Sequence, residues 1–457
     1  MAESKNRMTE GPIAGKIVRF ALPLFLGNLF QQLYNTADTL IVGNLLGSNA
    51  LAAVSSSGTL VYLLVGLFAG IAAGAGVVTA RYFGARDTER LQIAIHTTLA
   101  FGLATGVFLT VIGTLLAPTI LVWMDTPPEV MPQSVTYIRI YFAGSMSLVL
   151  FNVCMGIMQA VGDSKHPLYY LIISSLINIA LDVALIAWFR FGVGAAAFAT
   201  VLSQFVSVIL CLVRLMRTRE EYRVSLRKIR FDWDMLRQII RYGLPSGLQN
   251  SITGLANVVV QSNINTFGEM AMAGCGAYSK IEGFAFLPIT SFTMAITTFV
   301  GQNLGAEEYE RTRRGARFGI FCSVVLAEVI GVAFFLSAPQ LIAAFTDEPA
   351  AIAYGVEKAR ICSLFYAFLA YSHCISAVLR GAGRAAVPMA IMLTFWCGVR
   401  VTFLAVMVPL FQVIAVVNWV YPLTWSLSSL VFLIYYRKSD WLHGFQGETH
   451  RRVLKRK

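Results

Sequence analysis

The stretch KIVRFALPLFLGNLFQQLYNTADTLIVGNLL, residues 16–46, decides the fold. Between Phe20 and Leu46 it carries a single charged residue, Asp38. About 20 apolar residues are enough for a helix to cross the hydrocarbon core of a bilayer, so this stretch predicts a membrane-spanning helix. A carboxylate inside such a helix costs roughly 2.5–3.5 kcal/mol on insertion and usually has a function. A bend is expected at Pro23, which lies inside the same helix.

Composition extends the membrane assignment to the whole chain. Of 457 residues, 57% are hydrophobic and only 13% are charged, whereas a soluble domain has about 25% charged residues. The net charge of +12 lies in loops between apolar runs, without interleaved aromatic residues. We therefore predict an all-α integral membrane protein whose partner is the lipid bilayer and not nucleic acid.

Apolar segments separated by Gly and Pro predict twelve transmembrane helices. They are roughly residues 16–45, 51–81, 92–118, 132–160, 167–189, 193–216, 238–266, 272–301, 314–339, 352–379, 386–409 and 413–436. Thirty Lys and Arg residues fall on one side of these segments, and one, Arg190, falls on the other. Because cytoplasmic loops carry the excess of Lys and Arg, both termini are expected in the cytoplasm, with the protein in the cell inner (plasma) membrane.

An internal repeat divides the chain into two halves. Four pairs of motifs recur at separations of 221 or 222 residues: IVRFALP (17–23) with IIRYGLP (239–245), FGARDTER (83–90) with LGAEEYER (304–311), DTPP (125–128) with TDEP (346–349), and QAVGDSKHP (159–167) with RGAGRAAVP (380–388). Six spans in each half make a parallel repeat, which in transporters places a substrate path between the halves. The expected domains are a cytoplasmic N-terminus (1–15), an N-terminal six-helix lobe (16–216), a basic cytoplasmic linker (217–237), a C-terminal six-helix lobe (238–436) and a basic cytoplasmic tail (437–457).

A second embedded carboxylate, Asp182, is expected at the same depth as Asp38. Each lies seven residues before the outer end of an outward-running segment, roughly 10 Å below the edge at a rise of 1.5 Å per residue. Asn178 precedes Asp182 by one turn, and Thr200 lies about seven residues into the next segment, which runs inward. One half of the protein should therefore bring these four side chains to one level.

Two carboxylates in a low-dielectric site cannot both ionise cheaply, so the pair is expected to take up a proton or bind a cation. Oxygen ligands suit H⁺ or Na⁺, whereas a transition metal would need His or Cys nearby. The repeat partners of Asp38 and Asp182 in the second half are Val260 and Phe403, so coupling to a cation is expected in the first half. The alternative for Asp38 is a structural ion pair with Arg139 or Arg400.

Polar residues in other spans are candidates for a substrate cavity. Gln249, Thr253, Asn257 and Gln261 recur every four residues, and this stripe could line a cavity or bind neighbouring helices. Three more candidates are Asn35, Asn152 and His373. Lys280 and Glu282 are expected to pair locally.

Several motifs together resemble the multidrug and toxic compound extrusion (MATE) transporters over nearly the whole chain. They are ALP (21–23), YNTAD (34–38), VGDSKHP (161–167), NIALD (178–182), GVGAAAFAT (192–200) and GLP (243–245). The resemblance implies a V-shaped bundle of twelve helices that exports organic, often cationic, compounds in exchange for H⁺ or Na⁺, with no other cofactor. It also implies a cation site at Tyr34, Asp38, Asn178, Asp182 and Thr200, and a bending first helix at Pro23. A monomer is expected.

The chain departs from one branch of that family, which has an acid in segments 7 and 10 of the second half. The seventh span (238–266) has no acidic residue, and the tenth span (352–379) has only Glu357, near its outer end. The bacterial and archaeal branch that is coupled through the N-terminal half is the better match.

Two other classes of function compete with export of small organic molecules. A flippase of the same superfamily, for lipids or lipid-linked oligosaccharides, would need cationic residues in a central cavity to hold a pyrophosphate, and few embedded Lys or Arg are placed for that. A membrane enzyme is disfavoured, because the chain has no nucleotide-binding loop, metal-ligand spacing or serine–histidine arrangement in a supporting context.

Overall fold

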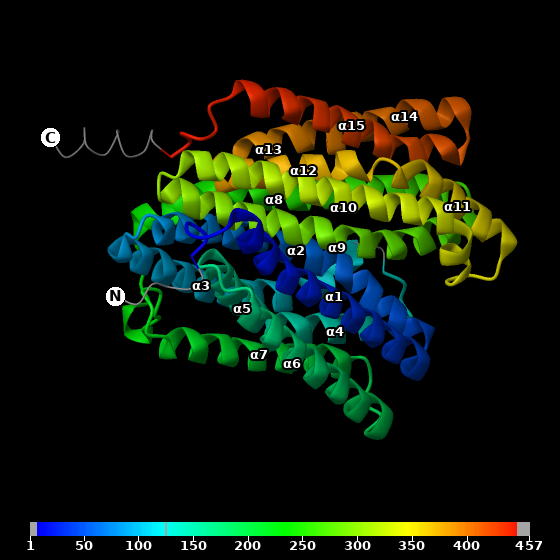
Figure 1. Ribbon diagram of the computed structural model, residues 1–457. Helices are drawn as coiled ribbons and strands as arrows, with labels where there is room; N and C mark the ends of the chain where they lie inside the picture. Colours follow the sequence, from blue (N-terminus) through cyan, green and yellow to red (C-terminus); the bar gives the residue numbers. More distant parts are fainter. Residues whose placement is uncertain (1–6, 124–125, 446–457) are drawn as a thin grey trace. The chain divides into compact units, whose positions relative to one another are not determined.

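The computed structural model describes residues 7–123 and 126–445, apart from the side chains of residues 39, 40, 44, 48, 49, 51, 52 and 55–65. Every regular element in these residues is helical (Figure 1). The first half contains α1 Ile13–Leu46, α2 Ser48–Gly84, α3 Thr88–Trp123, α4 Met131–Ala143, α5 Ser145–Ala160, α6 Lys165–Asp182, the π-helical η1 Val183–Trp188, α7 Gly194–Arg217 and the short 3₁₀ helix η2 Leu226–Lys228. The second half contains α8 Trp233–Asn265, α9 Glu269–Gly305, α10 Tyr309–Ala343, α11 Pro349–Ser363, α12 Tyr366–Gly381, α13 Ala386–Met392, the π-helical η3 Leu393–Val399, α14 Arg400–Phe411 and α15 Ile414–Lys438.

Each of the twelve expected spans coincides with one helix or with consecutive helices. By length and composition, nine helices of the described residues could cross a membrane, and two bent pairs raise the number to eleven. The bends measure 48° between α4 and α5 and 55° between α11 and α12. The twelfth span is α8, where the polar stripe beginning at Gln249 lowers the hydropathy of a 33-residue helix. The all-α fold with twelve spans agrees with the sequence analysis.

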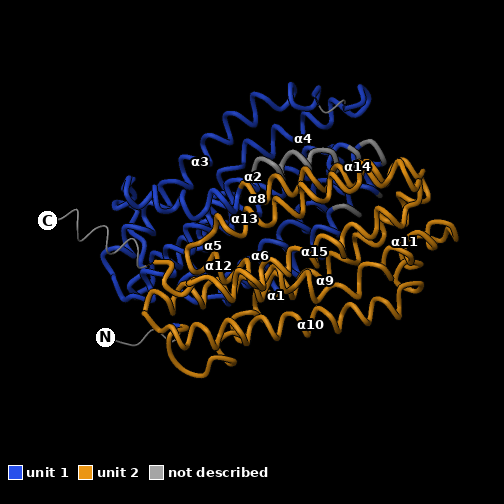
Figure 2. The backbone as a smooth tube through the Cα atoms, turned by 90° about the horizontal axis from the view of Figure 1, so that it is seen from above, with its two compact units in different colours: residues 1–7, 26–247 blue, residues 8–25, 248–457 orange. Residues whose placement is uncertain are grey.

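The chain forms two compact units, whose boundaries fall inside two helices (Figure 2). Unit 1 comprises residues 1–7 and 26–247, and unit 2 comprises residues 8–25 and 248–457. The boundaries therefore interrupt α1 after Phe25 and α8 after Gly247. Each helix carries a proline close to its boundary, Pro23 in α1 and Pro245 in α8. A proline removes one helical hydrogen bond, so both helices are weakened where the chain passes between units.

The start of α1 is held within unit 2 by backbone and apolar contacts. The Met8 N–H donates to Gln302 Oε1 at 2.9 Å, and Arg311 Nη2 donates to the Met8 carbonyl at 3.0 Å. Buried apolar residues of this segment pack with two residues of α9; the group is Met8, Ile17, Phe20, Ala21, Leu24, Ala295 and Phe299. These contacts explain why residues 8–25 belong to unit 2 although the rest of α1 belongs to unit 1.

Within unit 1, α2 and the first half of α8 approach each other through glycines. Gly70 and Gly74 on α2 face Gly247 and Gly243 on α8, and a Cβ atom at any of the four would collide with the opposite backbone. Both pairs have the small-xxx-small spacing that lets helix backbones touch in a membrane. This contact holds residues 233–247 of α8 within unit 1.

Candidate functional site

Asp182 and Asn178 form the centre of the candidate site, on α6. Their exposed fractions are 0% and 1%, and residues four apart lie on the same helix face. The Asn178 side-chain N–H donates to Asp182 Oδ2 at 3.2 Å, and its side-chain oxygen accepts from the Thr200 backbone N–H at 3.3 Å. Asp182 is also the last α-helical residue before η1. Such π-helical segments within α-helices often mark functional sites.

Asp38 of α1 meets Asp182. The two carboxyl groups lie within hydrogen-bonding distance of each other. The Oδ1 atom of each is buried, and neither has a hydrogen-bond partner in the described part of the chain. Ionised carboxylates only accept hydrogen bonds, so two of them can meet in this way only when a proton or another cation lies between them. The geometry is that of a pair able to hold one positive charge.

Thr200 and Tyr34 complete the group that the sequence indicated. The Thr200 hydroxyl donates to the Ala196 carbonyl at 3.0 Å, on α7. Tyr34 lies one turn before Asp38, is half-buried, and is within electrostatic range of both carboxyl groups. The structure thus brings Tyr34, Asp38, Asn178, Asp182 and Thr200 together in unit 1 from three helices.

Sequence reasoning missed two tyrosines of α4 beside this group. Tyr137 is 7% exposed and lies within electrostatic range of both Asp38 and Asp182. Its ring stacks with Tyr141, with centroids 6.1 Å apart and planes 20° from parallel. A phenol can donate one hydrogen bond and accept others, so these residues give the pair polar neighbours that carry no charge.

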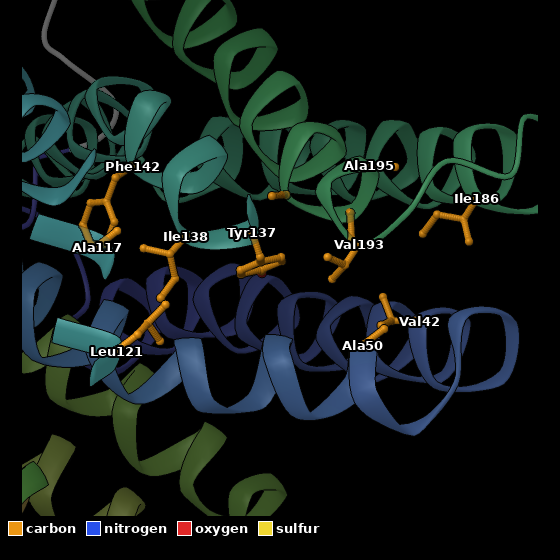
Figure 3. Packing of buried hydrophobic residues seen from close by; sticks show 12 residues of the cluster. Val42, Ala50, Ala117, Leu121, Tyr137, Ile138, Phe142, Ile186, Val193 and Ala195 are labelled. Carbon is orange, nitrogen blue, oxygen red and sulfur yellow. The ribbon is translucent and has the colours of Figure 1, made fainter. Parts of the chain in front are cut away.

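Tyr137 belongs to a cluster of buried apolar residues (Figure 3). Its buried members are Val42, Ala50, Ala117, Leu121, Tyr137, Ile138, Phe142, Ile186, Val193, Ala195, Ala196 and Ala197. Val42 lies one turn after Asp38, and Ile186 lies one turn after Asp182. Apolar side chains exclude water, and electrostatic interactions between the enclosed charges are stronger as a result.

The corresponding positions of unit 2 are apolar. Val260 is buried in a cluster with Leu404, and Phe403 packs against the same cluster. The repeat partners of the two carboxylates therefore belong to one apolar cluster and carry no carboxyl group. The alternative ion-pair partners of Asp38 lie elsewhere: Arg139 is exposed, and Arg400 donates to Asn257 and Thr424.

The polar stripe on α8 has two environments. Gln249 is buried, and its Nε2 contacts Met392 Sδ at 2.7 Å, while Thr253 is half-buried. Asn257 is exposed and accepts from Arg400 Nη1 at 3.0 Å, and exposed Gln261 donates to the next turn of the same helix. Gln249 and Asn257 thus both contact other helices, and the side chains of Asn257 and Gln261 are exposed.

The remaining candidates for a substrate cavity lie in both units. Asn35 and Asn152 of unit 1 are exposed, and the Asn152 amide donates to the Leu148 carbonyl at 2.8 Å. His373 of unit 2 is half-buried, with its ring 6.0 Å from that of Phe286 and 5.3 Å from that of Trp396.

The expected pairing of Lys280 with Glu282 is wrong. The Lys280 ammonium lies 5.9 Å from the Phe345 ring, and Glu282 accepts a hydrogen bond from Tyr278 at 3.0 Å. Residues two apart on a helix point to different sides, which is why the two charges do not meet.

Comparisons with known proteins agree with this architecture. A model of the MatE family matches residues 23–184 and 245–406, one stretch in each half of the chain. The chain is 29% identical over 92% of its length to a probable multidrug resistance protein, YoeA, of Bacillus subtilis, covering 92% of that protein. It is 27% identical to the probable multidrug resistance protein NorM of Thermotoga maritima, over 89% of this chain and 88% of that protein. A solved structure of an outward-facing multidrug resistance MATE family transporter shares 25% identity, with a TM-score of 0.90 over 96% of this chain and 98% of that one.

Proposed function

Because the chain belongs to the MatE family of multidrug efflux transporters, we propose that it is a secondary active antiporter that exports organic compounds in exchange for H⁺ or Na⁺. The observation that carries this proposal is the contact between Asp38 and Asp182 inside unit 1. Buried carboxylates are costly in a membrane protein, and an ion or proton pathway is their usual role.

The five residues of the site have distinct tasks in this proposal. Asp38 and Asp182 share the driving cation, so that its release and rebinding change the charge of the pair. The Asn178 amide holds Asp182 in place and is itself fixed by the Thr200 backbone N–H. Tyr34 and Thr200 offer oxygens to a cation that lies beside the carboxylates. Moving one charge across 100 mV supplies about 2.3 kcal/mol, or a concentration ratio of roughly 40-fold, without ATP.

Transport by purified protein in liposomes tests the proposal. A pH gradient and a Na⁺ gradient are imposed separately, and export of a fluorescent organic compound is followed. One of the two gradients should drive accumulation against the concentration gradient. If neither gradient drives it, the protein is not an antiporter for these ions.

The distribution of Lys and Arg predicts that the linker at residues 217–237 is cytoplasmic and that Arg190 lies on the opposite side of the membrane. Arg219 in the linker and Arg190 between η1 and α7 are both exposed. In intact cells, an impermeant thiol reagent should label Arg190→Cys and should label Arg219→Cys only after the membrane is permeabilised. Wild type controls for reaction of the native cysteines. Labelling of Arg219→Cys from outside intact cells would reverse the proposed orientation.

We expect Pro23 to act as a hinge. It is buried within α1, two residues before the boundary at Phe25, so bending there would let the two parts of the helix follow different units. Pro23→Ala restores a helical hydrogen bond and stiffens this point. The variant should fold and reach the membrane, but it should export several-fold more slowly.

Pro118→Ala is the matched control, since Pro118 lies inside α3 far from either unit boundary. It should transport at nearly the wild-type rate. A wild-type rate for Pro23→Ala at matched expression would refute the hinge.

A further inference from the structure

Unit 2 contains two buried cations that the proposed cation site does not use. Lys358 on α11 is 2% exposed, and Arg400 at the start of α14 is 1% exposed. Lys and Arg are almost never fully buried unless they are paired with an anion. A buried charge without a partner loses its hydration and is costly. The positive charges of Lys358 and Arg400 therefore need compensating partners.

The partners of Arg400 are neutral. Its Nη1 donates to Asn257 Oδ1 at 3.0 Å, and its Nη2 donates to Thr424 Oγ1 at 3.2 Å. Its buried Nε has no hydrogen-bond partner in the described residues. The guanidinium lies over two rings, 4.8 Å from the centroid of Tyr421 and 5.4 Å from that of Trp396.

Lys358 is held between aromatic rings. Its Nζ lies 5.4 Å from the centroid of Tyr278 and 5.2 Å from that of Tyr421. Tyr421 therefore contacts both cations, and the two belong to one cluster. Cation–π contacts attract a cation without neutralising its charge.

One carboxylate faces the cluster. Glu282 is within electrostatic range of Lys358 and Arg400, and it accepts a hydrogen bond from the Tyr278 hydroxyl. No ion pair joins either cation to a carboxylate among the residues that the structure describes. Glu357 has its carboxyl beside Asn418. With one acid against two bases, the cluster keeps one net positive charge.

We propose that Lys358 and Arg400 bind a carboxylate or phosphate group of the exported compound, next to the aromatic faces of Trp396 and Tyr421. The inference rests on the proposed export function and names the charge of its cargo. Asn257, the exposed partner of Arg400, marks the side from which an anion would arrive. An anion in place of the Asn257 amide would form a charge-assisted bond with Nη1 of the guanidinium, and such bonds are about twice as strong as neutral ones.

The two units then carry opposite charges at related places. In unit 1, Asp182 immediately precedes η1, and in unit 2, Arg400 immediately follows η3. Each π-helical segment lies in the fifth span of its half. An anion in unit 2 and a cation in unit 1 are therefore bound by different side chains and need not compete for one site.

A pair of probes with the same ring and opposite charge tests the inference by binding alone. The probes are 1-naphthoate and 1-naphthylmethylammonium, measured by equilibrium dialysis on wild-type protein in phosphatidylcholine nanodiscs, with empty nanodiscs subtracted. Naphthoate should bind more tightly than the ammonium compound. Arg400→Gln and Lys358→Gln should each weaken naphthoate binding by about tenfold or more, because each removes a charged partner.

Arg360→Gln is the matched control, since Arg360 is an exposed base on the same helix as Lys358. It should leave naphthoate binding unchanged. If Arg400→Gln does not fold, Arg400→Lys keeps the charge but loses the forked donors and should still weaken binding. Equal binding of naphthoate by Lys358→Gln, Arg400→Lys and wild type would overturn the inference.

Three further outcomes separate this inference from its alternatives. If phosphatidylglycerol in the nanodiscs displaces naphthoate competitively, the site holds a lipid headgroup and the assignment to cargo is wrong. If naphthoate binds as expected while liposomes show no gradient-driven export, the anion site stands and the antiport proposal fails. If export proceeds but the Lys358 and Arg400 variants bind naphthoate like wild type, the antiport proposal stands and the anion site is wrong.

Discussion

Asp38→Asn is expected to abolish export driven by an ion gradient while leaving the protein folded in the membrane. Asparagine keeps the shape of the side chain but can neither ionise nor share a proton with Asp182. Asp182 then remains the one ionisable group of the pair, and the shared cation site that the proposal requires is lost. Folding should survive, because removing a buried charge relieves its desolvation.

The measurement is substrate export from vesicles with an imposed pH or Na⁺ gradient, at matched expression. Asp234→Asn provides the control, since Asp234 is an exposed acid at the start of α8 in the same unit. Asp182→Asn should also be severely impaired, but less so, because Asn178 and Thr200 still offer oxygens beside it. Concentrative export by Asp38→Asn at the wild-type rate would show that coupling does not pass through unit 1.

The meeting of Asp38 with Asp182 could be predicted because helix geometry is regular. A constant rise per residue converts distance from the end of a span into depth, and periodicity places Asn178 on the face of Asp182. Tyr137 and Tyr141 could not be found in this way. Their span is broken by a 48° bend between α4 and α5, so the face that α4 presents depends on how that bend is packed.

Burial of Lys358 and Arg400 was also beyond the sequence. Lys358 lies near the start of its span, where a long basic side chain normally extends toward the headgroups, whereas Arg400 lies near the middle of the span Ala386–Phe411. In the structure they instead turn toward Tyr421 of α15, a partner supplied by a distant part of the chain. Hydropathy locates a span, but it does not reveal which aromatic residues of other spans can receive a cation.

The twelve spans and the repeat could be predicted, because each is a local or periodic property of the sequence. The sequence did not predict that the start of α1 belongs to unit 2 and the start of α8 to unit 1. This assignment depends on contacts between distant residues, such as that of Met8 with Gln302. One signal for it was present and overlooked. Gly70 and Gly74, together with Gly243 and Gly247, have the spacing of helices that touch through their backbones.

Gly74→Leu should therefore prevent unit 1 from packing correctly. A side chain at this position would collide with the backbone of α8 at Gly243, and a backbone cannot move aside as a flexible side chain can. Overpacking a core typically costs about 1–3 kcal/mol, and a clash with main chain lies at the upper end of this range. A cost of about 3 kcal/mol lowers the folding equilibrium constant by roughly 100-fold, because each 1.4 kcal/mol changes it tenfold, so we expect a lower melting temperature and a reduced yield of folded protein.

The yield of monodisperse protein from detergent extracts measures the effect, together with its melting temperature. Gly66→Leu is the matched control, because Gly66 lies on the same helix and a Cβ atom there meets nothing within 4 Å in the described structure. Gly243→Leu should reproduce the loss from the α8 side of the contact, since both substitutions separate the same two helices. Equal yields from Gly74→Leu and Gly66→Leu would mean that α2 and α8 can part without unfolding the unit, and that the glycines serve its motion and not its stability.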